Sequence, residues 1–217
     1  NGKGKEYSSN DGLLLFEGEY FYGKKWNGKG YDSEKNIIYE LKNGKGDIIG
    51  EYITKDLIFE GEYKNGKKNG KGKEYNVNLR NNDTIANFLN ITFFEGYYLN
   101  GERSGKGKEY YETGELLFEG EFLYGERNSH GKEYNKNGEL IYEGQYFNNK
   151  KTGKGKEYLK EELIFDGKYC YGEKWDGNGK EYNKNGQLLF EGEYIKGLKN
   201  GKALEYHING ELKFEGE

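Results

Sequence analysis

The chain is poor in several residue types that common protein classes need. Its 217 residues include no proline, no methionine, two histidines and one cysteine, Cys170. A single cysteine excludes an intramolecular disulfide and favours a reducing compartment, so we expect a cytoplasmic protein. No apolar run approaches the ~18 residues of a transmembrane helix. The sequence starts without methionine in the middle of a repeat, and we expect it to be part of a longer chain.

Residues that carry chemistry are equally sparse. His130 and His207 lie in different repeats with no cysteine at metal-ligand spacing, and nothing suggests the base that Cys170 would need as a nucleophile. Segments such as residues 70–73, Gly-Lys-Gly-Lys, lack the Ser/Thr and the helix of a phosphate-binding loop. The net charge of −4 gives no general attraction to nucleic acid. We therefore expect no enzyme, cofactor, metal or nucleic-acid partner.

What the chain does have is 22 tyrosines, 12 phenylalanines and 36 glycines. They recur in a phrase, an aromatic residue followed by Glu-Gly-Glu-Tyr or a close variant, as in residues 16–20, 59–63 and 190–194. The later central glycines are separated by 24, 24, 23, 25 and 24 residues: Gly96, Gly120, Gly144, Gly167, Gly192 and Gly216. A fixed period of this length indicates a repeat architecture, which offers an extended surface more naturally than one catalytic pocket.

One repeat, residues 131–155, has the pattern of a β-hairpin. An extended run is followed by Asn137-Gly138, a strong signal for a short hairpin turn, and then by a second strand over residues 139–146. Residues 147–153 are predicted to form a polar loop before the next repeat. No helical period competes, so we predict an all-β protein, an elongated single-layer antiparallel β-meander with one strand pair per repeat.

Alternation of side chains predicts two different faces for this sheet. Aromatic residues and Gly144 share one face, where glycine leaves room for a ring to lie across the backbone. We expect Tyr134 of the first strand to join this aromatic face. The repeated glutamates are predicted to form a solvated opposite face, partly neutralised by lysine: Glu17, Glu19, Glu60, Glu62, Glu119, Glu121, Glu191 and Glu193.

These repeats resemble a known family. Residues 59–72, Phe-Glu-Gly-Glu-Tyr-Lys-Asn-Gly-Lys-Lys-Asn-Gly-Lys-Gly, are similar to the MORN (membrane occupation and recognition nexus) repeat. The resemblance covers essentially all of residues 1–217 and implies a single array of about eight to nine repeats, a β-solenoid-like rod with a groove. It also implies a scaffold or protein-binding module, which in some members precedes an enzyme domain.

Two repeats depart from the pattern. In the second repeat, Tyr39-Glu40-Leu41 occupies the place of the phrase, with Tyr39 as its aromatic residue and no central glycine. We expect the sheet to bend or narrow there. An insertion over residues 77–90 carries an apolar patch that could dock a partner, and Phe88 and Leu89 are its candidate binding residues.

Loop spacing singles out further candidates. The last aromatic residue of the phrase usually precedes the first glycine of the following Gly-x-Gly by seven residues. In three repeats this spacing is eight residues: Tyr20 to Gly28, Phe122 to His130 and Tyr169 to Gly177. In this interpretation His130 replaces a glycine. The same repeats contain the partner-binding candidates Tyr22, Trp26, Tyr124, Tyr171 and Trp175. Tyrosine and tryptophan anchor many interfaces, although these rings could instead only pad the loop against the neighbouring repeat.

We predict a non-enzymatic scaffold that binds proteins, including itself end to end or as a dimer through open sheet ends. The Asn-, Lys- and Tyr-rich composition resembles protists with AT-rich genomes and suggests a cytoskeletal or ciliary assembly. One alternative is a membrane tether that binds anionic lipid through a lysine-rich loop edge, which the acidic face opposes: Lys64, Lys67, Lys68, Lys71, Lys150, Lys151, Lys154 and Lys156. The other is a regulatory region of a larger enzyme such as a phosphoinositide kinase.

Overall fold

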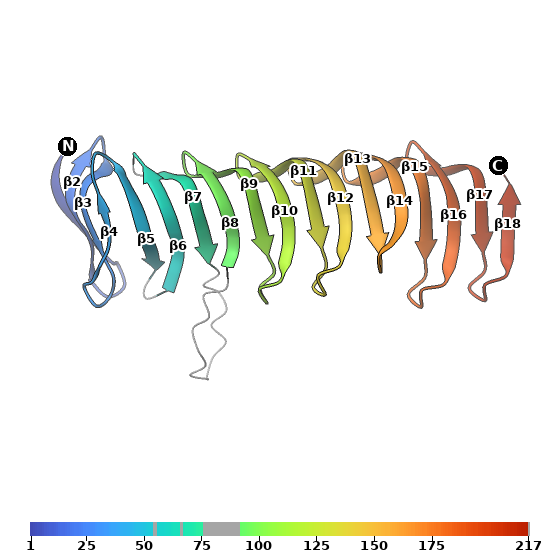
Figure 1. Ribbon diagram of the computed structural model, residues 1–217, viewed down its shortest axis with the longest axis horizontal. Helices are drawn as coiled ribbons and strands as arrows, with labels where there is room; N and C mark the ends of the chain where they lie inside the picture. Colours follow the sequence, from blue (N-terminus) through green and yellow to red (C-terminus); the bar gives the residue numbers. More distant parts are fainter. Residues whose placement is uncertain (54–55, 66, 76–91, 217) are drawn as a thin grey trace. The chain divides into compact units, whose positions relative to one another are not determined.

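Strands and turns make up the part of the chain that the structure describes. The computed structural model describes residues 1–53, 56–65, 67–75 and 92–216, and these contain no helix (Figure 1). The chain divides into two compact units, Asn1–Glu115 and Leu116–Glu217, called here the N-terminal and C-terminal units. The insertion predicted at residues 77–90, with Phe88 and Leu89, lies outside the described residues.

Each unit is an antiparallel meander in which every strand pairs with the next one in sequence. The N-terminal unit contains β1 (Gly2–Tyr7), β2 (Leu14–Phe21), β3 (Lys24–Tyr31), β4 (Ile37–Leu41), β5 (Lys45–Ile53), β6 (Asp56–Lys64), β7 (Lys67–Tyr75), β8 (Thr92–Leu99) and β9 (Glu102–Tyr110). The C-terminal unit contains β10 (Leu116–Leu123), β11 (Glu126–Tyr134), β12 (Leu140–Phe147), β13 (Lys150–Leu159), β14 (Glu162–Cys170), β15 (Glu173–Tyr182), β16 (Leu188–Ile195), β17 (Leu198–Tyr206) and β18 (Leu212–Gly216). The predicted all-β antiparallel meander of hairpins is confirmed.

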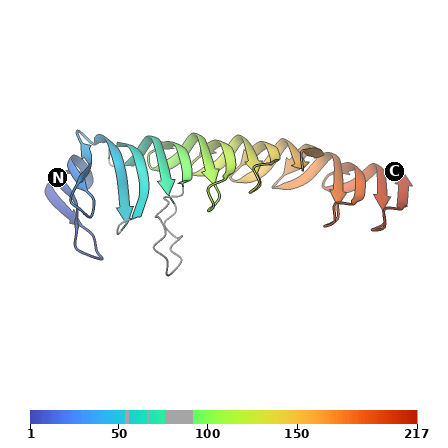
Figure 2. The same cartoon turned by 60° about the horizontal axis from the view of Figure 1, so that its bottom comes forward.

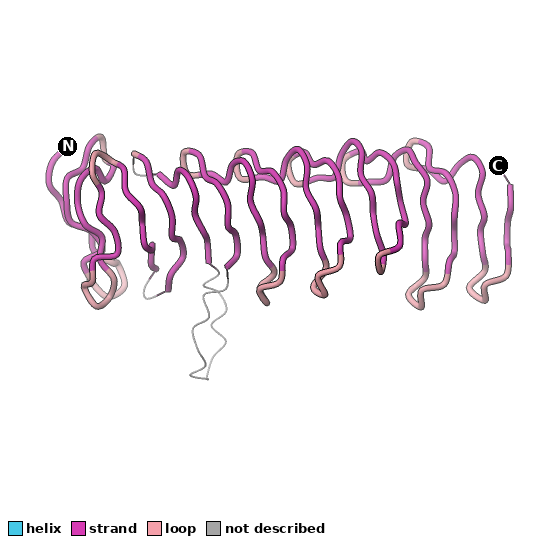
Figure 3. Tube along the Cα trace, in the orientation of Figure 1, coloured by secondary structure: helices cyan, strands magenta, loops and turns pink. Residues whose placement is uncertain are grey.

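Two-residue turns join the strands along one edge of each unit, and mostly longer turns join them along the other (Figure 3). Asn148 and Asn149 form one such two-residue turn with φ values of 47° and 64°, the left-handed conformation that suits the twist of a hairpin. The strand β13 begins directly afterwards at Lys150. The prediction of a polar loop over residues 147–153 is therefore wrong, because most of that segment is strand.

Two of the longer turns are held by an asparagine side chain. Asn135 Oδ1 accepts hydrogen bonds from the backbone N–H groups of Asn137 (2.9 Å) and Glu139 (3.0 Å). The N–H of Gly138, at φ 81°, donates to the carbonyl of Asn135 at 2.9 Å. The Asn-Gly pair therefore marks the hairpin as predicted, but its glycine closes a longer loop. Asn183 holds the turn before β16 in the same way.

Buried aromatic rings line one face of each sheet and form its core. Phe118 is fully buried, and its ring centroid lies 5.5 Å from that of Phe122 and 5.2 Å from that of Tyr146, both edge to face. Each such contact contributes ~0.5–1.5 kcal/mol beyond area burial. The same zipper continues through these buried rings: Phe16, Phe59, Phe94, Tyr98, Tyr142, Phe165, Tyr169, Phe190 and Tyr194.

Paired glycines make room for these rings. Gly120 lies opposite Gly131 in the β10–β11 ladder. A Cβ added to Gly131 would lie 2.3 Å from a ring atom of Phe118, and one added to Gly120 would lie 2.7 Å from the Cα of Gly131. Both distances are far below van der Waals contact, so a Cβ at either position would displace the ring or the opposite strand. This confirms the predicted role of the central glycine. In β17 the position equivalent to Gly131 carries alanine, Ala203, opposite Gly192.

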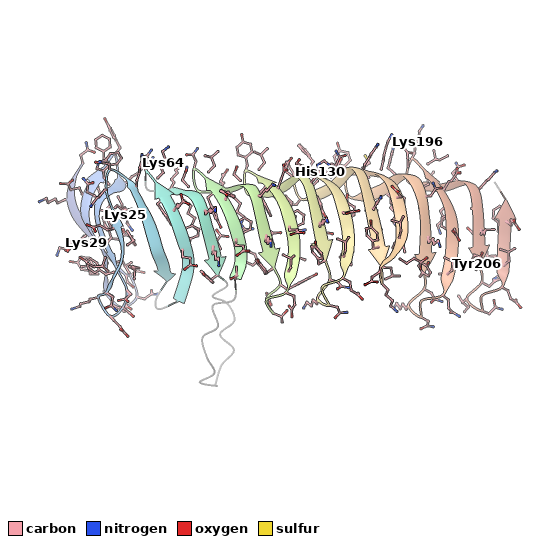
Figure 4. All side chains as sticks on the ribbon, viewed as in Figure 1. Lys25, Lys29, Lys64, His130, Lys196 and Tyr206 are labelled. Carbon is pink, nitrogen blue, oxygen red and sulfur yellow. The ribbon has the colours of Figure 1, made fainter. Side chains whose placement is uncertain are left out.

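The ring face also carries charge, which the prediction of two separate faces missed. Lys151 Nζ lies 4.2 Å from the ring centroid of Tyr142, 3.3 Å from Glu133 and 3.5 Å from Glu157. A cation over a ring contributes ~0.5–2 kcal/mol. Cations occupy equivalent positions over the other rings, including Lys25, which Figure 4 labels: Lys25, Lys68, Arg103, Arg127, Lys174 and Lys199. We call this row the cation ladder.

Tyr134 lies on the opposite face from the one predicted. Gly131 pairs with Gly144 and Glu133 pairs with Tyr142, and directly opposed residues share a face. Glu133 therefore lies on the ring face, and Tyr134 turns to the other side, where its hydroxyl donates to Glu119 at 2.7 Å. The tyrosines at this position clamp the outer glutamates instead of extending the core.

The second repeat is irregular, as expected, and β4 has only five residues. Gly30 lies opposite Tyr39, and Gly28 lies opposite Leu41. Leu41 therefore stands where other repeats have the second buried ring, and Tyr39 stands where they have glycine, which corrects its assignment as the first ring. Tyr39 stacks nearly parallel on Phe16, with centroids 6.1 Å apart and an interplanar angle of 15°.

Candidate interaction edge

The candidate site is the edge of each unit that carries the two-residue turns, which we call the turn edge. Its turns are residues 22–23, 43–44, 100–101, 124–125, 148–149, 171–172 and 196–197, and Asn65 follows β6 at the same edge. The two residues that flank a turn are directly opposite each other and form an edge pair. The edge pairs are Phe21/Lys24, Lys42/Lys45, Lys64/Lys67, Leu99/Glu102, Leu123/Glu126, Phe147/Lys150, Cys170/Glu173 and Ile195/Leu198.

Three predicted tyrosines occupy the first position of these turns. Tyr22, Tyr124 and Tyr171 have φ values of 49°, 53° and 52°, and they are 79%, 76% and 80% exposed. Asparagine, which tolerates the left-handed conformation, holds the same position in other turns, as at Asn100 with φ 54°. The rings therefore stand in solvent at a position that suits a different residue type.

A bulky side chain in the left-handed region costs on the order of 1–2 kcal/mol. The described contacts offer little compensation, since Tyr124 and Tyr171 remain more than three-quarters exposed. Backbone strain of this kind is concentrated at functional sites. The turn tyrosines are therefore the strongest candidates for contact with a partner.

The two tryptophans have a different environment. Trp175 is the unpaired residue of a bulge, because Tyr169 lies opposite Lys174 and Lys168 lies opposite Asp176. A Cβ added to Gly197 in the next turn would lie 3.6 Å from the Trp175 ring. The ring thus covers the neighbouring hairpin, as the padding alternative expects, and yet stays 39% exposed.

Trp26 repeats this arrangement in the N-terminal unit. It lies in a bulge between Lys25 and Asn27, and a Cβ on Gly44 would come within 2.8 Å of its ring. The Trp26 ring also lies 5.0 Å from that of Phe21. Both tryptophan rings pack against the glycine of the next turn. Their part in partner binding stays a prediction.

The third repeat assigned to this spacing class does not belong to it. In the β10–β11 ladder Gly120 pairs with Gly131 and Glu121 pairs with Asn128, so Ser129 and His130 have no partner on β10, although both pair with β12. Ser129, at φ 59°, takes the conformation that Gly153 has at φ 54° in the next repeat. Ser129, not His130, therefore replaces the first glycine. His130 is an ordinary exposed residue (labelled in Figure 4).

The structure places only some of the predicted partner-binding residues on the same edge. Tyr124 and Tyr171 lie on one edge of the C-terminal unit, four strands apart, which at ~4.8 Å per strand is about 19 Å. The edge pairs between and beside them expose further apolar side chains that the sequence analysis missed: Leu123 (44%), Phe147 (61%), Ile195 (43%) and Leu198 (69%). For Leu123, Phe147 and Ile195 the signal was an apolar residue just before the turn, on the face opposite the rings, whereas Leu198 follows its turn.

The predicted lysine-rich edge is also only partly correct. Lys64 and Lys67 are exposed edge-pair residues, and Figure 4 labels Lys64 at this edge. Lys68 and Lys151 instead belong to the cation ladder and lie 4.1 Å and 4.2 Å from the Phe59 and Tyr142 ring centroids. Lys68 and Lys151 therefore lie on the ring face and not at the turn edge.

Figure 2, turned from Figure 1, shows that the strands are bent rather than flat.

The titratable groups with shifted pKa values serve the fold. Burial alone would raise the pKa of Glu74, but Arg103 outweighs it and holds this pKa below its ordinary value. Burial and the hydrogen bond to Glu119 raise the pKa of Tyr134 to about 12. Among the described residues, no cluster of His, Cys, Asp or Glu could hold a metal ion.

No helix among the described residues is long and apolar enough to cross a membrane.

The fold and this edge define a class, the single-layer β-hairpin repeat proteins. The MORN repeat family profile matches residues 59–78, 94–115, 118–139, 142–160 and 190–211. Five segments of the chain are therefore MORN repeats, the units of a non-catalytic repeat family whose members generally contact proteins or lipids.

Other comparisons add no functional information. No curated protein matches the chain. Among solved structures, it is similar to a chain in the structure described as "Crystal Structure of TcdB2-TccC3-Cdc42", at 9% identity and a TM-score of 0.25. The match covers 97% of this chain and 12% of that one. A similarity this low carries no argument about structure or function.

Proposed function

We propose that the chain is a non-enzymatic scaffold module that binds a partner protein through the turn edge of the C-terminal unit. The observation that carries this proposal is the pair of exposed rings, Tyr124 and Tyr171, held in left-handed turn positions. Tyrosine supplies a large, rigid contact area and is enriched in the few residues that dominate binding energy.

The surroundings of the two tyrosines support a protein partner. Exposed edge-pair residues flank them, and Leu198 and Phe147 are 69% and 61% exposed. Apolar side chains gathered along one edge and bordered by charged residues, such as Glu126 and Glu173, are the pattern of a protein interface. A repeat array spreads such contacts along its length, which suits an extended partner.

The setting of this scaffold is part of the proposal. The composition of the chain supports a cytoplasmic cytoskeletal or ciliary assembly, and imaging of the tagged full-length protein would test that placement. Two alternatives predict different observations. A membrane tether would float with anionic vesicles at physiological salt, and a regulatory region would share its reading frame with an enzyme domain.

Crosslinking mass spectrometry of the native assembly tests the binding edge. In Tyr124→Asn/Tyr171→Asn, asparagine fits the left-handed turn, so the fold is retained while the rings are lost. Lys196→Asn changes the equivalent turn position, at φ 53°, and is the matched control. We expect the double variant to lose crosslinks to the partner and the control to keep them. Unchanged crosslinks in the double variant would refute the proposed edge.

A further inference from the structure

Lysines dominate the edge pairs of the N-terminal unit. Three successive turns, those after β2, β4 and β6, are flanked by Lys24, Lys42, Lys45, Lys64 and Lys67. All five side chains are exposed. Within the part of the chain that the structure describes, none of them makes an ion pair.

Two of these edge pairs consist of like charges. Lys42 lies directly opposite Lys45, with backbone hydrogen bonds of 2.8 Å and 3.0 Å between them. Lys64 lies directly opposite Lys67. Like charges directly opposite each other in a sheet are destabilising. These lysines are therefore not required for folding, and each like-charge pair slightly lowers the stability of the fold.

Hydrogen bonds connect the second of these turns to β3, which follows the first turn, and the third turn to the second. The N–H of Gly44 donates to the carbonyl of Trp26 at 2.7 Å, and the N–H of Asn65 donates to the carbonyl of Gly44 at 2.5 Å. Asn43 N–H also donates to Asn27 Oδ1 at 2.7 Å. The backbone therefore holds the five lysines in a row of fixed order. We call it the lysine row.

We propose that the lysine row docks an extended acidic segment of a partner protein. This inference rests on the proposed function in that the occupant is a protein, but it concerns a second surface with different chemistry. Charge complementarity carries it, because a cluster of unpaired cations attracts carboxylates and steers their approach.

The dimensions of the row favour a polypeptide strand. Successive turns on this edge are two strands apart, or about 9.6 Å at ~4.8 Å per strand. An extended segment in the polyproline II conformation advances ~3.1 Å per residue with three residues per turn, so every third side chain points the same way and meets the next turn. Acidic residues at every third position therefore match the row.

A flat anionic membrane fits the row less well. The next edge pair along the unit carries Glu102, and the adjoining face carries exposed glutamates such as Glu19 and Glu62. A wide anionic surface would approach these carboxylates together with the lysines and be repelled. A narrow segment can contact the three lysine turns alone.

Charge reversal within the edge pairs tests the proposal without removing the fold. Lys42→Glu/Lys67→Glu converts each like-charge pair into a Lys–Glu pair, so the variant should be as stable as the parent or more so. Lys150→Glu/Lys196→Glu in the C-terminal unit makes the same change in net charge away from the row. The probe is a fluorescein-labelled peptide of repeated Glu-Glu-Ser, followed by fluorescence anisotropy.

We expect the row variant to weaken peptide binding by about tenfold and the control variant to leave it nearly unchanged. Binding of the parent should also weaken as salt is raised. An equal loss in both variants would mean that only net charge matters, and would overturn the docking row. Phosphatidylserine vesicles are the second probe, and binding of vesicles but not peptide would overturn the choice of a protein segment.

The same assay separates this inference from the proposed function. Tyr124→Asn/Tyr171→Asn should keep full affinity for the acidic peptide, because its changes lie outside the lysine row. Loss of crosslinks in that variant with intact peptide binding supports both proposals. Intact crosslinks with peptide binding that depends on the row would leave the docking row standing and refute the C-terminal edge.

Discussion

In the N-terminal unit the residues beside the two-residue turns are mostly lysines, whereas in the C-terminal unit they are mostly apolar. Lys42/Lys45 and Lys64/Lys67 contrast with Leu123, Phe147 and the Ile195/Leu198 pair. The ring core and the cation ladder follow one pattern in both units, apart from the irregular second repeat. The difference teaches that the residues required by the fold recur from repeat to repeat. The residues of the turn edge are not required by the fold, so they can differ between repeats and specify a partner.

The largest expected effect tests whether the two cores are equivalent. In Gly107→Ala and Gly131→Ala, the new Cβ would lie 2.5 Å from the Phe94 ring and 2.3 Å from the Phe118 ring. Overpacking of this kind costs ~1–3 kcal/mol or more. We expect similar losses of stability, measured by thermal unfolding followed by circular dichroism. Lys132→Ala, on the outer face, is the control and should have little effect.

A somewhat smaller effect tests the cation ladder in both units. Arg103 and Arg127 stack over Phe94 and Phe118 at 4.2 Å and 4.3 Å, and each pairs with a glutamate. Both side chains are 16% exposed, so the energies of fully buried pairs do not apply, and we expect Arg→Met at either position to cost about 2 kcal/mol. Denaturant unfolding would measure it. A negligible loss in one unit alone would show that the cores differ as well as the edges.

Alkaline pH probes the tyrosines that clamp the outer glutamates. The pKa values of Tyr134 and Tyr158 are raised to about 12, first by burial and then by hydrogen bonds to Glu119 and Glu143. A raised folded-state pKa stabilises the fold below the ordinary tyrosine pKa of ~10, and that stability is lost as pH rises through the folded-state pKa. Unfolding free energy should therefore fall between about pH 10 and pH 12. Tyr134→Phe/Tyr158→Phe should show a shallower fall in this window.

The smallest effect sharpens the contrast between the edges. Replacing Tyr124 or Tyr171 by asparagine relieves a bulky residue from the left-handed region, and we expect a gain of about 0.5–1 kcal/mol per site. Differential scanning calorimetry of each single variant would detect the rise in melting temperature. A loss of stability instead would mean that these rings are held by the fold and are not kept for a partner.

Much of the fold followed from the alternation of residues along one repeat. The phrase around Gly144 was enough to place rings and glycine on one face, because side-chain period and glycine size are local properties. The place of Tyr134 was not predictable in the same way. Its face depends on which residue lies opposite Glu133, and that register is set by the pairing of Gly131 with Gly144 across the ladder.

The site was predictable only as a list of residue types. Counting residues to the next glycine grouped Phe122 with the tryptophan repeats, because the count could not distinguish a two-residue bulge at Ser129 and His130 from a single-residue bulge at Trp175. The lysines opposite each other across a turn were also hidden. Lys42 and Lys45 become neighbours only once the two-residue turn at Asn43 is known.

The cation ladder affects how repeats can be gained or lost during evolution. Lys151 pairs with Glu157 on its own strand and with Glu133 in the preceding hairpin, and Lys174 pairs with Glu157 in turn. If one whole repeat were duplicated or deleted, the new junction would again bring a cation beside a carboxylate two strands back. No partly buried charge would be left without an ion-pair partner. The molecule can therefore be lengthened or shortened in steps of one hairpin, with its turn edge rewritten separately for each partner.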